Sequence, residues 1–173
     1  SSQPFLVTFP NGGSITPSSF TSDLVINTGN DVLPFGAVAS DFDGDGKTDV
    51  GILKLNNPVS VPPGVLVYRN TGTGVQFAFT LAAELAGGYE SIAAADFDGD
   101  GKPDIVMTAG SNFMIYLNSS TPGNISFQPV ITLSNSYSPG RLCVADVDGD
   151  GKTDLITNNS PSAGLAIRRN ISE

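Results

Sequence analysis

Three copies of one acidic pattern are the residues of this sequence with the clearest chemistry. The pattern is Asp-x-Asp-Gly-Asp-Gly-Lys-x-Asp, and it occupies residues 41–49, 96–104 and 146–154. Four carboxylates within nine residues repel one another unless a cation neutralises them. Oxygen donors at positions 1, 3, 5 and 9 suit Ca²⁺. The pattern therefore predicts three calcium sites, one in each copy.

The predicted ligands are the four aspartates of each copy and the backbone carbonyl of its position-7 lysine, whose side chain should point outward. Glycine at position 6 permits the positive φ that wraps a chain round an ion. Simple Asp-Gly surface turns predict neither this spacing nor its recurrence, and Mg²⁺ seldom uses an all-protein cage. The ligands are Asp41, Asp43, Asp45, Lys47 and Asp49 in the first copy, Asp96, Asp98, Asp100, Lys102 and Asp104 in the second, and Asp146, Asp148, Asp150, Lys152 and Asp154 in the third.

The residues around the acidic pattern argue against an EF-hand. An EF-hand needs Glu at position 12 and a helix on each side, but position 12 is Ile52, Met107 or Thr157. Short apolar runs bounded by turn residues flank each copy, and such runs are typical of buried strands. Each acidic loop should therefore join the two strands of a tight hairpin.

The same loops carry the net charge of the chain, which is −9 from 17 acidic and 8 basic residues. Each copy has four Asp and one Lys, so the three copies together account for all of it. Nucleic acids and anionic membrane surfaces attract clustered cations, which this chain does not offer. No apolar stretch approaches the ~18 residues of a membrane-spanning segment. We expect no nucleic-acid partner and no membrane insertion.

The side chains that the sequence lacks make an enzyme a poor interpretation. There is no His and no Trp, and the one Cys, Cys143, lies in an apolar run where we expect a buried small hydrophobe. Nucleophiles activated by His are therefore excluded. Once twelve Asp are assigned to metal, five acidic residues remain for the opposed carboxylate pair that a glycosidase needs. We predict a non-catalytic protein.

The acidic loops belong to a longer repeat, because they start at residues 41, 96 and 146. A third apolar run follows each hairpin and ends in Asn70, Asn118 or Asn170, and a fourth strand is marked by Phe77 or Phe127. Four short antiparallel strands per repeat predict an all-β fold of β-propeller-type blades. We expect one domain over residues 1–173, with repeats at approximately 37–85, 91–134 and 141–173.

The two ends of the chain match incomplete blades. Residues 4–29 look like the outer strands of a preceding or closing blade, since Ser18-Ser19-Phe20 aligns with Ile125-Ser126-Phe127, whereas the last repeat stops after its third strand. Three blades cannot enclose a propeller channel. The chain is thus expected to be either an arc of a longer propeller or a unit completed by assembly, in which two copies make six blades through exchanged terminal strands.

These features together resemble the FG-GAP or VCBS-type repeats of integrin-α-like β-propellers. The segment Phe35-Gly36-Ala37-Val38-Ala39 keeps the Phe-Gly element of the family. The other copies read Gly88-Tyr89-Glu90-Ser91 and Pro139-Gly140-Arg141-Leu142 at that place, and the Gly-Ala-Pro element is absent. The resemblance therefore favours the broader, mostly bacterial, secreted group over the integrins themselves.

The resemblance implies calcium loops on one face of the blades and ligands on the opposite face. The sizeable side chains with chemistry in the loops of that opposite face are Phe35, Tyr89, Glu90, Tyr137 and Arg141. We expect a calcium-stabilised, non-catalytic module for adhesion or for recognition of a protein or carbohydrate ligand. The alternatives are a fragment of a secreted polysaccharide lyase or glycoside hydrolase, and a purely structural spacer. Loops of this kind need millimolar calcium, which predicts an extracellular or cell-surface location.

Overall fold

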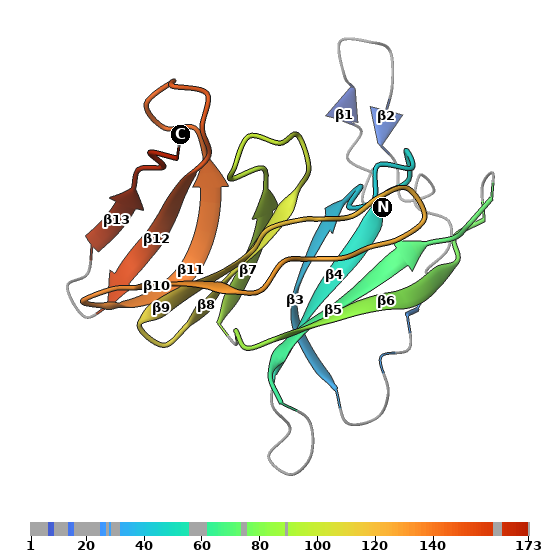
Figure 1. Ribbon diagram of the computed structural model, residues 1–173, viewed down its shortest axis with the longest axis horizontal. Coiled ribbons are helices and arrows are strands. Elements are labelled where there is room, and N and C mark those ends of the chain that lie inside the picture. Colours follow the sequence, from blue (N-terminus) through green and yellow to red (C-terminus); the bar gives the residue numbers. More distant parts are fainter. Residues whose placement is uncertain are drawn as a thin grey trace, which may run out of the picture.

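The computed structural model describes residues 7–8, 14–15, 25–26, 28, 32–55, 62–73, 76–88, 90–160 and 164–172. All regular elements in these ranges are antiparallel β-strands (Figure 1). They contain no helix that could span a membrane. The all-β fold predicted from the sequence is therefore confirmed.

Three sheets follow one another along the chain, and each corresponds to one predicted blade. The first sheet has the order β3-β4-β5-β6, the second β7-β8-β9-β10 and the third β11-β12-β13, while β1 and β2 form a separate pair. The strands are β1 (Val7–Thr8), β2 (Ser14–Ile15), β3 (Leu33–Ser40), β4 (Asp49–Leu55), β5 (Gly64–Asn70), β6 (Phe79–Ala86), β7 (Ser91–Ala95), β8 (Asp104–Ala109), β9 (Asn112–Tyr116), β10 (Ile131–Ser134), β11 (Ser138–Ala145), β12 (Asp154–Ser160) and β13 (Gly164–Arg168).

Each acidic loop joins the first two strands of its blade, as predicted. The strands on either side pair antiparallel up to the loop, with Ser40 opposite Asp49, Ala95 opposite Asp104 and Ala145 opposite Asp154. The loops therefore occupy the same end of all three blades. Of the residues taken to mark the fourth strands, Phe77 lies before β6 and is exposed, and Phe127 lies before β10 in an isolated bridge to Asn118.

The core lies between neighbouring blades, because the central strands are apolar on both faces. Val65 and Val67 of β5 point toward the second blade and pack in one cluster with Ile105 and Met107 of β8. Val106, which lies between Ile105 and Met107 on β8, points to the other face of the sheet. There it packs with Phe113 of β9 and with Leu155 of the third blade. Such continuous apolar strands are expected of sheets covered on two sides.

Cys143 is exposed, so the prediction of a buried thiol is wrong. It lies on β11 directly opposite Ile156 of β12, which in turn lies opposite Ile167 of β13. The equivalent residues Val38 and Ala93 are covered by the blade that follows their own. Among the described residues no blade covers this face of the third sheet, which is why an apolar run leaves its thiol accessible.

One buried amide connects the first two blades through the backbone. The side-chain Nδ2 of Asn118 donates to the carbonyl of Phe42 in the first acidic loop and to that of Pro103 in the second, each at 2.8 Å. Its Oδ1 accepts from the Ser120 amide. Asn118 is buried, so loss of this side chain leaves two carbonyls without their donor.

We expect Asn118→Ala to lower the free energy of unfolding by about 2–3 kcal/mol, the cost of leaving buried carbonyls unsatisfied. Denaturant titration at neutral pH measures it. The matched control is Asn112→Ala, because the side chain of Asn112 makes a single, exposed hydrogen bond among the described residues, to Ser134, and its loss should change stability by less than about 1 kcal/mol. Equal effects of the two substitutions would contradict a special role for Asn118.

Candidate functional site: three acidic loops

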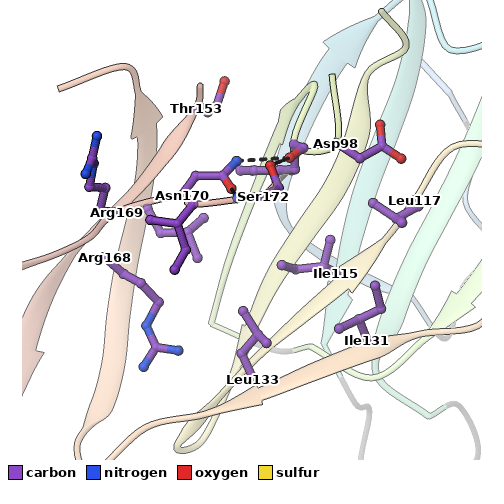
Figure 2. Close-up of a pocket in the computed structure, with 13 residues that line it drawn as sticks. Asp98, Ile115, Leu117, Ile131, Leu133, Thr153, Arg168, Arg169, Asn170 and Ser172 are labelled. Atoms are coloured by element: carbon purple, nitrogen blue, oxygen red, sulfur yellow. Dashed lines mark hydrogen bonds between the residues drawn. The ribbon is translucent and has the colours of Figure 1, made fainter. Parts of the chain in front are cut away.

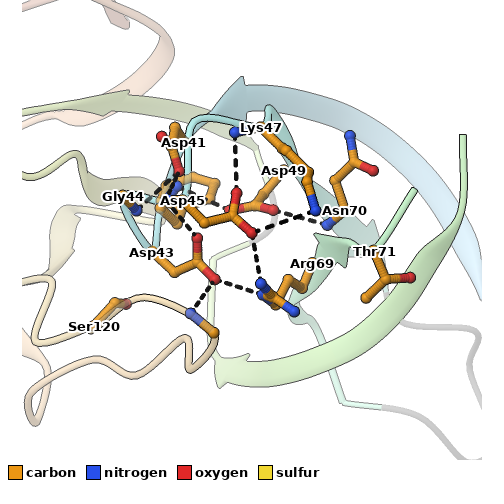
Figure 3. A network of polar contacts seen from close by, with 12 residues as sticks. Asp41, Asp43, Gly44, Asp45, Lys47, Asp49, Arg69, Asn70, Thr71 and Ser120 are labelled. Atoms are coloured by element: carbon orange, nitrogen blue, oxygen red, sulfur yellow. Dashed lines mark hydrogen bonds and ion pairs between the residues drawn. The ribbon is translucent and has the colours of Figure 1, made fainter. Parts of the chain in front are cut away.

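The first acidic loop is organised around the carboxylate of Asp41. Its Oδ1 accepts from the Gly44 amide at 2.9 Å and its Oδ2 from the Gly46 amide at 2.8 Å (Figure 3). The two glycines have φ of 72° and 86°, values that L side chains rarely adopt. The loops of the second and third blades repeat the bonds to positions 4 and 6 with Asp96 and Asp146. The glycines thus allow the backbone to wrap round the first aspartate.

The position-9 aspartate fastens each loop to the third strand of its blade. Asp49 is fully buried, and its two oxygens accept from the amides of Phe42 at 2.9 Å and Asn70 at 2.8 Å. Asp104 and Asp154 are buried in the same way and accept the equivalent pair of amide bonds. Position 9 therefore has a structural role that the spacing alone did not predict, in addition to its predicted role as a ligand.

Burial makes the position-9 carboxylates of the first two loops reluctant to ionise. Desolvation, helped by the nearby charges of Asp98 and Asp100, raises the pKa of Asp104 to about 6 in spite of its two amide hydrogen bonds. Desolvation also raises the pKa of Asp49. Each loop thus holds a buried carboxylate beside other negative charges, an arrangement that a bound cation would stabilise.

Three groups of carboxylates could hold a metal ion, one in each loop. In each group, one oxygen from every aspartate lies within 4.8 Å of the others. The groups are Asp41, Asp43 and Asp45 in the first loop, Asp96, Asp98 and Asp104 in the second, and Asp146, Asp148 and Asp154 in the third. Hard, anionic oxygens are the donor set that Ca²⁺ takes, so the residues present fit that ion.

The position-7 lysines keep their ammonium groups on the outer side of the loops. Lys47 and Lys102 are part-exposed and lie 3.8 Å and 3.5 Å from the position-5 carboxylates Asp45 and Asp100. Lys152 instead donates to the Ser172 carbonyl. Outward lysine side chains agree with the prediction that position 7 offers its backbone carbonyl to the ion. Ligation by that carbonyl stays a prediction.

Two arginines enter this site that the sequence analysis missed. Arg69 at the end of β5 pairs through Nε with Asp43 and through Nη2 with Asp45, both at 2.5 Å (Figure 3). Arg169 pairs in the same way with Asp148 and Asp150. Both precede the asparagine that ends the third run of each repeat, a position held by Leu117 in the second blade. The arginine at the same place in the first and third repeats was the feature of the sequence from which these ion pairs could have been predicted.

The arginine changes the electrostatics of the first loop. Burial alone would raise the pKa of Asp43, but the hydrogen bonds from Arg69 and from the Gly123 and Asp45 amides outweigh it and hold the pKa below its usual value. The second loop receives no such cation from Leu117. The three acidic loops are thus alike in backbone and unlike in charge.

The candidate ligand residues lie where the first strand of each blade begins, opposite the acidic loops. Phe35 is 54% exposed near the start of β3, and Arg141 is exposed on β11. Glu90 and Tyr137, just before β7 and β11, are half-buried. Tyr89 lies outside the described residues. The structure therefore places four of the five at one end of the blades.

Glu90 differs from the other candidates at this end. Its Oε2 is buried and has no hydrogen-bond partner among the described residues. Desolvation raises its pKa. An unpaired buried acceptor of this kind is uncommon, and it provides a place for a hydrogen-bond donor.

We expect Arg69→Leu to lower the melting temperature in EDTA, because Asp43 and Asp45 lose their counter-charge, and to enlarge the rise in melting temperature that calcium produces. Leu117→Arg should have the opposite effect on both quantities. Differential scanning calorimetry with and without calcium measures them. Arg141→Leu, which removes an exposed arginine outside the loops, is the control. The same calcium response in all three variants would contradict a counter-charge role.

Comparison with known families agrees with this geometry. The sequence profile of the FG-GAP-like repeat matches residues 41–107 and 96–157, each match beginning at an acidic loop and running into the β-strands that follow. No curated protein and no solved structure gives a significant match. The two matches together cover more than half of the chain, and they contain the three acidic loops and the third strands of the first two blades. The chain belongs to the FG-GAP-like repeat family.

Proposed function

We propose that this chain is an extracellular, non-catalytic binding module whose blades are stabilised by three calcium ions. The observation that carries the proposal is the threefold recurrence of carboxylate oxygens within 4.8 Å of one another in loops of one backbone form. The aspartates and the position-7 carbonyls would hold the ions. Ion binding to the folded state alone would stabilise each blade by mass action.

The opposite end of the blades is the proposed recognition surface for a protein or carbohydrate. Phe35 supplies an exposed ring that could stack on a sugar or pack against an apolar side chain. Glu90 supplies a half-buried carboxyl group, and Arg141 supplies an exposed cation. These groups come from three successive blades, so a ligand that contacts all of them must span blades.

The expected weakness of the calcium sites is the argument for a location outside the cell. Extracellular calcium modules bind with dissociation constants of about 10⁻⁴–10⁻³ M, and calcium reaches that concentration only outside the cytosol. In two of the three loops an arginine, Arg69 or Arg169, already pairs with an aspartate of the loop, and this positive charge lowers the attraction of the loop for a cation. Weak sites of this kind fit a calcium-rich environment.

We expect calcium to raise the melting temperature and EDTA to lower it, by several degrees, because calcium at 100 times its dissociation constant adds about 2.7 kcal/mol per site. Calorimetry against calcium concentration measures the effect. Asp98→Ala should remove the contribution of the second loop. Lys102→Ala is the matched control, since only its backbone carbonyl is a predicted ligand. A melting temperature independent of calcium would refute calcium stabilisation.

We expect the calcium-loaded chain to retain a glycan on an array, or a surface protein in a pull-down, and to show no turnover of polysaccharides. Phe35→Ala and Glu90→Gln should weaken the captured interaction about 10-fold or more, as loss of a central contact does. Phe77→Ala is the control, because Phe77 is an exposed phenylalanine beside the first acidic loop, at the other end of the blade. Polysaccharide cleavage by the chain would instead support the enzyme alternative.

A further inference from the structure

An apolar pocket of about 420 Å³ lies between the second and third blades. Its apolar lining includes Phe97, Ile115, Leu117, Ile131, Leu133 and Leu155, and Figure 2 shows four of these, Ile115, Leu117, Ile131 and Leu133, on one side of it. These side chains come from the second acidic loop, β9 and the residue after it, β10 and β12, and the rest of the lining comes mostly from residues 168–172 at the end of β13 and after it. Arg168 and Arg169 also line the pocket, but most of the lining surface is apolar, as at an interface between blades.

The same positions between the first and second blades surround two side chains of the crossing segment, residues 118–128. Strand pairing and position in the loop align the residues of the two interfaces one by one. The equivalents of Phe97, Ile115, Leu133 and Leu155 are, in that order, Phe42, Val67, Leu85 and Ile105. Ile125 is buried in this cluster and Phe127 packs against it. The Phe127 ring meets Phe42 edge-on with centroids 5.9 Å apart.

The backbone anchor of the crossing segment is present at both interfaces. Asn118 Nδ2 donates to the Phe42 carbonyl, and Asn170 Nδ2 donates to the Phe97 carbonyl at 2.9 Å. After Asn118 the chain brings Ile125 and Phe127 into the first interface. Among the described residues, nothing brings an equivalent pair into the second interface, and the pocket lies where that pair would be.

The edge of the third sheet is open at the same place. In the other two blades a fourth strand pairs with the third, β6 with β5 and β10 with β9. The third sheet, as described, has the order β11-β12-β13, and Leu165 and Ile167 on β13 are 69% and 53% exposed. A strand that fills the pocket would therefore also find an edge with which to pair.

The chain contains one further segment with the required pattern. Ser18-Ser19-Phe20 aligns with Ile125-Ser126-Phe127, and Leu24-Val25-Ile26 aligns with the start of β10. In its own chain, Ile26 packs on the outer face of the first blade. Six extended residues span at most about 21 Å, which is little more than the straight-line thickness of the two sheets, each about 10 Å, that separate that face from the pocket. A chain cannot pass through the sheets, and the way round their edges is longer than the straight line. The segment that could enter the pocket therefore belongs to another molecule.

We propose that the pocket between the second and third blades binds residues 18–26 of a second copy of this chain. Phe20 fills the pocket against Phe97, and residues 24–26 extend along β13. Because each copy has one pocket and one segment, the exchange is reciprocal and closes as a dimer. It depends on apolar contacts and strand pairing, so it stands apart from any external ligand.

The first test is the mass of the full chain in calcium by light scattering across the micromolar range. The expected result is twice the mass of one chain, and the mass of one chain for Phe20→Ala. A wild-type chain that is monomeric throughout overturns the proposal, as does a dimer that Phe20→Ala leaves intact. Neither result bears on calcium stabilisation or on the opposite face of the blades, so the two proposals fail separately.

The second test measures binding of a labelled peptide of residues 14–28 to the full-length Phe20→Ala chain by fluorescence anisotropy. Ile131→Asp in that chain should weaken binding at least 10-fold, because Ile131 lines the pocket. Val130→Asp is the matched control, since Val130 is a neighbour of similar exposure, 38% against 43%, and lies outside the lining. Equal binding to both variants, or equal binding of a peptide with Phe20→Ala, overturns the proposal.

Discussion

The buried carboxylate at position 9 is the interaction on which each blade depends. Asp49, Asp104 and Asp154 each accept one amide from their own loop and one from the end of the third strand. A single side chain thereby fixes the hairpin turn, the register of the third strand and the position of the neighbouring carboxylates. The cost is a desolvated negative charge, and the raised pKa of Asp104 shows this cost. A bound cation would offset it.

The hairpins, the number of repeats and the position of the loops could be predicted because they follow from local patterns. Short apolar runs, Asp-Gly turns and a repeated spacing each constrain a few neighbouring residues, and all three predict the same blade. Because these three patterns agree, few of the strands predicted from the sequence differ from those in the structure. Phe77, for example, was assigned to a fourth strand from its alignment with Phe127, but the strand begins two residues later at Phe79.

Contacts between distant residues could not be predicted in this way. The pairing of Arg69 with Asp43 and Asp45 depends on how the end of the third strand approaches the loop, 24 to 26 residues away in sequence. The exposure of Cys143 depends on whether another blade covers β11, which no local pattern of apolar residues reports. Asn118 likewise appeared as the end of a strand, whereas its amide spans 76 residues to reach Phe42.

The first acidic loop is completed by the repeat that follows it. The amide of Gly123, in the crossing segment of the second blade, donates to Oδ2 of Asp43 at 2.9 Å. Binding of an ion in that loop would therefore be thermodynamically linked to folding of the next repeat, as nearest neighbours are linked in a one-dimensional array. A repeat cut from this chain and grafted elsewhere would not carry its affinity for an ion with it, because part of that affinity belongs to its neighbour.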